Sequence, residues 1–104
     1  MITTRQFALG TLAASVMLAG QASAAEITDN EIRIGYLADM SGVYRDPIGP
    51  LGLDAIQMAV DEMGGNIQGA EIVLFSADDR NSADVGSSVV REWIDERNVD
   101  MVTG

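Results

Sequence analysis

One short polar segment carries three side chains that can hold a small polar solute. Ser41 supplies a hydroxyl, Tyr44 a ring that can stack, and Arg45 a fixed positive charge. The backbone N–H groups of Ser41 and Gly42 add donors able to cradle a carboxylate. The segment therefore indicates non-covalent capture of a solute. A tyrosine here can equally cover the edge of a sheet, and that alternative stays open.

A second polar segment contains Asp78 and Asp79. Its carboxylates can contact a ligand or a metal ion. Alternatively, they cap the next helix and face water, because the positive end of a helix dipole favours acidic groups. Asp78 is kept as a candidate ligand contact, and no metal ligand is assigned. Asp39 is expected to hydrogen-bond amides of its own loop.

The composition excludes several classes of enzyme and partner. The chain has 104 residues, with 16 acidic residues, six arginines and no lysine, histidine or cysteine, and a net charge of −10. Nucleic-acid binding needs clustered Lys and Arg, so no such partner is expected. The chain has no histidine for a serine–histidine hydrolase and no cysteine for a thiolate zinc site, so both are excluded. The chain contains no G-x-G-x-x-G motif, so a dinucleotide ligand is not expected. We expect no catalytic residue, no metal and no cofactor.

An alternation of strands and helices positions these candidate groups. Short apolar runs predict strands, and apolar residues at helical spacing predict helices. Strands are expected at residues 32–37, 71–76 and 99–102; helices at 53–63 and from a cap at Asn81 or Ser82 to Asn98. Short intervals between the strands require parallel pairing with right-handed crossovers. The predicted fold class is α/β, a doubly wound parallel sheet.

Ligands of such sheets bind beyond the carboxyl ends of the strands. Three segments lie at that edge: residues 38–50, residues 77–81 and the residues from Thr103 onward. The candidate ligand-binding residues are therefore Ser41, Gly42, Tyr44, Arg45, Asp78 and Thr103.

Other residues are given structural roles. Trp93 lies on the apolar stripe of the second helix and is expected in the core. Gly86 on the same stripe suggests close backbone packing, since glycine costs helix propensity. A turn is expected around Asn66 and Gly69. Three methionines are expected to fill space: Met58, Met63 and Met101.

Residues 1–24 read as a cleavable secretory signal. Arg5 precedes an uncharged apolar stretch at 7–20, and Ala22-Ser23-Ala24 offers a small-x-small cleavage pattern. An apolar stretch of about 14 residues is shorter than the roughly 20 that a membrane span needs. We therefore expect an exported protein that is not embedded in a membrane.

Residues 31–104 together resemble the periplasmic solute-binding proteins of ABC transporters, in the branched-chain amino-acid (leucine-binding-like, type I) family. The matching segments, in order, are 32–37, Asp39-Met40-Ser41-Gly42-Val43-Tyr44, GLDAIQMAVDEMGG at 52–65, 69–74, 76–81, 83–85 and 99–102. The resemblance implies two α/β lobes that close on a small solute and deliver it to an ABC permease in the inner membrane. It matches Tyr44 to a ligand-binding tyrosine of the family. The Asp-Met-Ser-Gly and Ser-Ala-Asp-Asp forms resemble a branch that includes binders of aromatic acids and amides.

On this resemblance, residues 25–104 are the βαβαβ start of the first lobe, an incomplete domain expected to be unstable by itself. The expected function is periplasmic capture of amino acids or related organic acids and amides for uptake. One alternative is a ligand-sensing receptor domain of the same fold, which a downstream transmembrane segment would favour. The other is a secreted α/β enzyme with its nucleophile past residue 104, which turnover would reveal.

Overall fold

The computed structural model describes residues 27–104. The predicted signal peptide, residues 1–24, lies outside the described residues.

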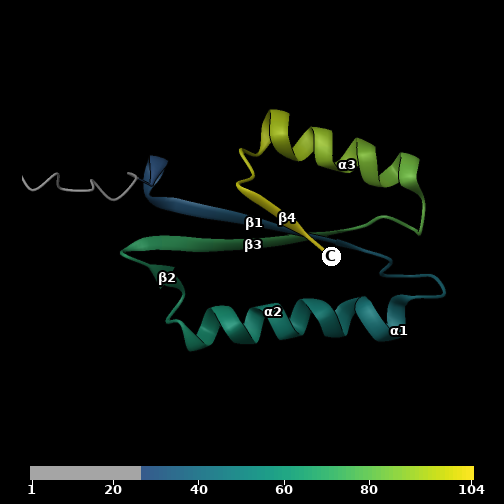
Figure 1. The fold of residues 1–104 in the computed structure, drawn as a ribbon, viewed down its shortest axis with the longest axis horizontal. Coiled ribbons are helices and arrows are strands. Elements are labelled where there is room, and N and C mark those ends of the chain that lie inside the picture. The colour runs from purple at the N-terminus through teal and green to yellow at the C-terminus, as the bar shows by residue number, and fades with distance from the viewer. Residues whose placement is uncertain (1–26) are drawn as a thin grey trace, which may run out of the picture.

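A four-stranded sheet forms the centre of the described fold (Figure 1). Its strands are β1 (Glu31–Ala38), β2 (Asn66–Ile67), β3 (Ala70–Asp78) and β4 (Met101–Thr103). The order across the sheet is β2-β3-β1-β4, and β1 pairs in parallel with both β3 and β4. The three predicted strands and their parallel pairing are confirmed.

The two long helices cover opposite faces of the sheet (Figure 1). They are α2 (Pro50–Glu62) and α3 (Ala83–Glu96). The connection through α2 places β3 on one side of β1, and the connection through α3 places β4 on the other. The predicted doubly wound α/β architecture is therefore confirmed.

The predicted turn at Asn66–Gly69 contains an additional short strand. β2 pairs antiparallel with the start of β3, which makes the sheet mixed. Gln68 and Gly69 connect the two strands with φ of 52° and 84°. Two positive φ angles in a two-residue loop are typical of a tight hairpin whose twist suits the strands.

Trp93 anchors α3 to the sheet, as predicted. The side chain is 3% exposed, and its ring meets Phe75 edge to face with centroids 5.0 Å apart. A side chain at Gly35 would collide with the Trp93 ring, so this glycine lets the indole lie directly on β1.

The prediction of close backbone packing at Gly86 was wrong. A Cβ atom there would lie 3.6 Å from Leu37 Cδ2, which is an ordinary van der Waals distance. The glycine whose missing side chain the packing of α3 requires is instead Gly35, beneath the Trp93 ring.

On the other face, Tyr36 is buried and its hydroxyl donates to the carbonyl of Ile48. Gly52 in the first turn of α2 leaves room for that hydroxyl. The prediction that three methionines fill space was wrong, because Met58, Met63 and Met101 are 64%, 55% and 50% exposed. Met58 lies on α2, Met63 is the C-cap residue of α2, and Met101 lies on the edge strand β4.

Candidate functional site

The carboxyl ends of β1, β3 and β4 meet at one edge of the sheet, where the sequence placed the candidate site. Ala38 at the end of β1 is paired in register with Asp78 at the end of β3. Thr103 on β4 is paired with Tyr36 of β1. The segments after β1 and β3 therefore lie side by side, with Thr103 on the other flank of β1.

Asp39 organises the segment that follows β1. Its side chain is 2% exposed and accepts hydrogen bonds from the amides of Gly42 (2.7 Å), Tyr44 (3.1 Å) and Ser41 (3.3 Å). A Cβ atom at Gly42 would lie 2.6 Å from an Asp39 carboxylate oxygen, so glycine is required there. The expectation that Asp39 binds loop amides is confirmed.

This arrangement corrects one part of the sequence analysis. The amides of Ser41 and Gly42 were expected to cradle a ligand carboxylate. In the structure both donate to the carboxylate of Asp39. The chain thus supplies its own anion to these donors.

Asp78 ties the segment after β1 to the segment after β3. One of its oxygens accepts the amides of Met40 (3.0 Å) and Arg80 (2.9 Å), and the other accepts the Ser41 hydroxyl at 2.6 Å. The Ser41 hydroxyl, with help from the two amides, holds the pKa of Asp78 below its ordinary value. Hydrogen bonds to the charged form favour ionisation.

Asp79 closes the second segment on itself. Its carboxylate accepts the amide of Asn81 at 2.7 Å, and its own amide donates to the carbonyl of Ala38 at 3.0 Å. The N-cap of α3 is Ser82, whose hydroxyl accepts the Val85 amide at 3.4 Å. Asp78 and Asp79 therefore hold the loops together. Capping of the next helix was a possible role for this pair, but Ser82 caps α3 instead.

Three carboxylates come close together in this cluster. Oxygens of Asp39, Asp78 and Asp79 all lie within 4.8 Å of one another. Each of the three carboxylates accepts at least one N–H group, and these dipoles offset the repulsion among the charges. The close approach thus has an explanation that requires no cation.

Tyr44 and Arg45 lie on the exposed rim beside this cluster. The segment predicted as loop contains a one-turn helix, α1 (Arg45–Ile48), with Tyr44 as its N-cap. Tyr44 is 51% exposed, and the Arg45 guanidinium contacts the Asp46 carboxylate at 3.2 Å. A pocket of 370 Å³ borders Arg45, and its other lining residues are Met40, Asp46, Pro50 and Leu51.

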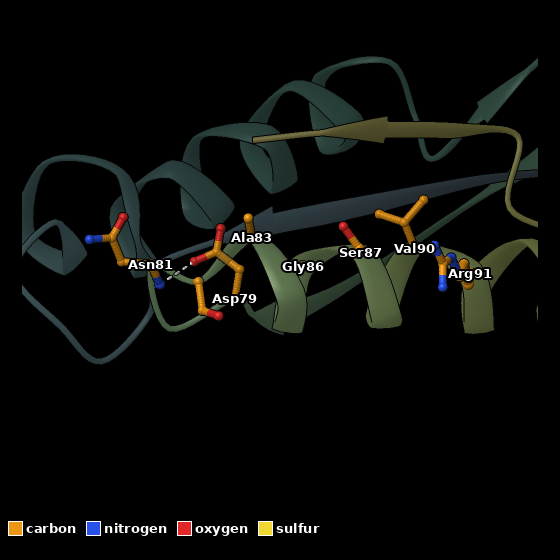
Figure 2. Close-up of a pocket in the computed structure, with 8 residues that line it drawn as sticks. Asp79, Asn81, Ala83, Gly86, Ser87, Val90 and Arg91 are labelled. Atoms are coloured by element: carbon orange, nitrogen blue, oxygen red, sulfur yellow. Dashed lines mark hydrogen bonds between the residues drawn. The ribbon is translucent and has the colours of Figure 1, made fainter.

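A larger open groove, missed by the sequence analysis, runs from the second segment along α3. It has a volume of 780 Å³ and is lined by Asp79, Asn81, Ser82, Ala83, Gly86, Ser87, Val90 and Arg91. Figure 2 shows Ala83, Ser87 and Val90 pointing the same way from α3, with Asp79 and Asn81 beyond its first turn. Small residues at positions 83, 86 and 87 are the sequence signal that could have revealed this groove.

Comparison with known proteins identifies the family to which this fold belongs. Residues 31–104 match the sequence family described as periplasmic binding protein. The chain belongs to the periplasmic binding protein family. The match begins with the first residue of β1 and includes the four strands of the sheet and the helices α1, α2 and α3. A search of curated protein sequences gives no significant match.

Solved structures of the family have the same fold. A periplasmic binding protein from Burkholderia mallei matches with 42% identity and a TM-score of 0.68 over 70% of this chain and 20% of its own. A branched chain amino acid ABC transporter periplasmic ligand-binding protein from Burkholderia xenovorans LB400 matches with 39% identity and a TM-score of 0.66 over 69% and 19%.

A third structure supports the fold alone. It is a solute binding protein of an ABC transporter from Rhodopseudomonas palustris BisB5, in complex with 3,4-dihydroxy benzoic acid. It matches with 20% identity and a TM-score of 0.64, over 71% of this chain and 20% of its own. The chain therefore spans about one fifth of the length of each of these structures. Within residues 27–104, no helix has the length and apolar character of a membrane span.

Proposed function

We propose that this chain is the first part of an exported solute-binding protein that captures amino acids, or related organic acids and amides, for uptake by an ABC permease. Residues 1–24 are its secretory signal, and the mature protein works in the periplasm. Residues 25–104 begin its first lobe. The family match over 31–104 is the observation that carries the proposal.

The binding surface is the edge formed by the segments after β1 and β3. Ser41, Tyr44 and Arg45 face the solute, and Thr103 contributes from the flank of β1. Gly42 and Asp78 hold the first segment in shape. A second lobe closes over the solute and excludes water, as in hinged binding proteins. No covalent step is involved, so the solute leaves unchanged.

A thermal-shift screen of the full-length protein tests this function. The compounds are amino acids, amides and aromatic acids. A ligand at about 100 times its Kd stabilises the folded state by about 2.7 kcal/mol, enough for a shift of a few degrees. If none of the compounds stabilises the protein, the result contradicts the proposal. Recovery of a chemically altered compound would instead favour an enzyme.

A matched pair of variants tests the surface. Tyr44→Ala removes a ring whose stacking is worth about 0.5–1.5 kcal/mol, so we expect roughly 2- to 12-fold weaker binding of the best compound. Ile94→Ala is the control, because Ile94 is also exposed but lies near the far end of α3. Equal affinities of the two variants would argue against a contact at Tyr44.

A further inference from the structure

The Ser41 hydroxyl has one proton, and the neighbouring Asp78 carboxylate determines where that proton points. The Oγ atom lies 2.6 Å from an oxygen of Asp78, the length of a hydrogen bond between a hydroxyl and an ionised carboxylate. An ionised carboxylate only accepts hydrogen bonds, so Ser41 is the donor. The side of Ser41 that remains open to solvent then offers lone pairs.

The neighbouring amides are committed in the same way. Met40 donates to Asp78, and Ser41 and Gly42 donate to Asp39. These three N–H groups are therefore not free to donate a hydrogen bond to a solute beside the Ser41 hydroxyl. A solute group that meets the Ser41 hydroxyl finds an acceptor.

We propose that Ser41 is a specificity-determining residue that accepts a hydrogen bond from the solute, with Asp78 as the positioning residue that holds its proton. This part of the rim thus selects solutes that present an N–H or O–H group, such as an ammonium, an amide or a phenol. It disfavours a bare carboxylate or ether oxygen, which would place lone pair against lone pair. The inference rests on the proposed function and refines it.

Paired probes that differ by one donor group test the selection on the full-length protein. L-leucine is compared with isocaproate, which lacks the ammonium, and para-hydroxybenzoate with benzoate, which lacks the hydroxyl. Isothermal titration calorimetry gives the affinity ratio within each pair. We expect the wild type to prefer the donor-bearing member of the pair that it binds, by about tenfold for one hydrogen bond to a charged or polar group.

Two substitutions should reduce that ratio. Ser41→Ala removes the acceptor. Asp78→Asn lets an amide N–H donate to Ser41, which frees the hydroxyl proton to point at the solute. Ser41→Thr keeps a hydroxyl and should keep the preference. Asp79→Asn is the matched control, since Asp79 accepts the Asn81 amide and is one residue away. Ratios that stay unchanged in both Ser41→Ala and Asp78→Asn would overturn the inference.

A readout without any solute separates this inference from the proposed function. Carbon-detected NMR titration gives the pKa of the Asp78 carboxyl. The carboxyl signal of Asp78 is identified as the one that disappears in Asp78→Asn. Ser41→Ala should raise this pKa, because the Ser41 hydroxyl is the main group that lowers it. Ser88→Ala, which removes a hydroxyl on α3 that donates to the Asp84 carbonyl, should leave it unchanged. An unchanged pKa in Ser41→Ala overturns the inference, whereas failure of every probe to bind contradicts the proposed function.

Discussion

At the scale of single residues, the chemistry of the rim depends on where each carboxylate obtains its donors. Asp39 was recognisable from the sequence as a residue that binds its own loop, because it lies at the end of a predicted strand. The partnership of Ser41 with Asp78 was not recognisable. It joins two segments that are far apart in the chain and meet only after the sheet has formed. The predicted carboxylate cradle was wrong in its donors for a different reason, because the amides of Ser41 and Gly42 donate to Asp39.

Asp39→Ala should destabilise the full-length protein strongly. Three amides lose the buried carboxylate that accepts their hydrogen bonds, which we expect to cost on the order of 3 kcal/mol. Urea unfolding measures the loss. Asp79→Ala is the control, because its side chain accepts one amide and should cost less. Equal losses in the two variants would contradict the role given to Asp39.

The contribution of Asp78 to stability should depend on pH. Its pKa in the folded protein lies below the ordinary value of 3.8, so its ionised form stabilises the fold above that value. The contribution should be fully present near neutral pH and decline as the pH falls below about 4. The difference in unfolding free energy between wild type and Asp78→Asn, measured at neutral pH and again in acid, gives this directly. A difference that grows in acid would show the opposite linkage.

At the scale of elements, the alternation of strand and helix was predictable because each element has its own apolar period. The core position of Trp93 was predictable as well, but the residues that it contacts on the sheet were not. Gly35 lies in the middle of a regular strand, and only the arrival of Trp93 from α3 explains why it has no side chain. Gly86, in contrast, interrupts a helix where its absence of side chain is not required. The short strand β2 was also missed, since two residues carry too little pattern to identify a strand.

Alanine at each glycine tests this distinction. Gly35→Ala should cost about 1–3 kcal/mol, because the added methyl overpacks against the Trp93 ring. Gly86→Ala should be neutral or stabilise by up to about 1 kcal/mol through helix propensity. Thermal unfolding of the two full-length variants compares them. The reverse order of stabilities would mean that α3 sits differently on the sheet.

At the scale of the whole molecule, residues 27–104 bury little apolar surface. The buried apolar side chains among them are Tyr36, Ala38, Val60, Ala70, Ile72 and Trp93. Leu51, Met101 and Val102 are exposed, and the last two lie on the edge strand β4. An uncovered edge strand with apolar side chains favours association with other chains.

A polypeptide of residues 25–104 should therefore aggregate or remain without a cooperative unfolding transition when it is produced alone. Circular dichroism during heating, combined with light scattering, measures both properties. A sharp, reversible transition in a monomer would contradict this expectation.

The most direct measurement is a crystal structure of the full-length protein with the compound that stabilises it most. We expect the compound at the carboxyl edge of β1 and β3, with one of its N–H or O–H groups within hydrogen-bond distance of Ser41 Oγ and its body against Tyr44. A compound bound elsewhere, with the segments after β1 and β3 left open to solvent, would contradict the assignment of this edge as the solute-binding surface.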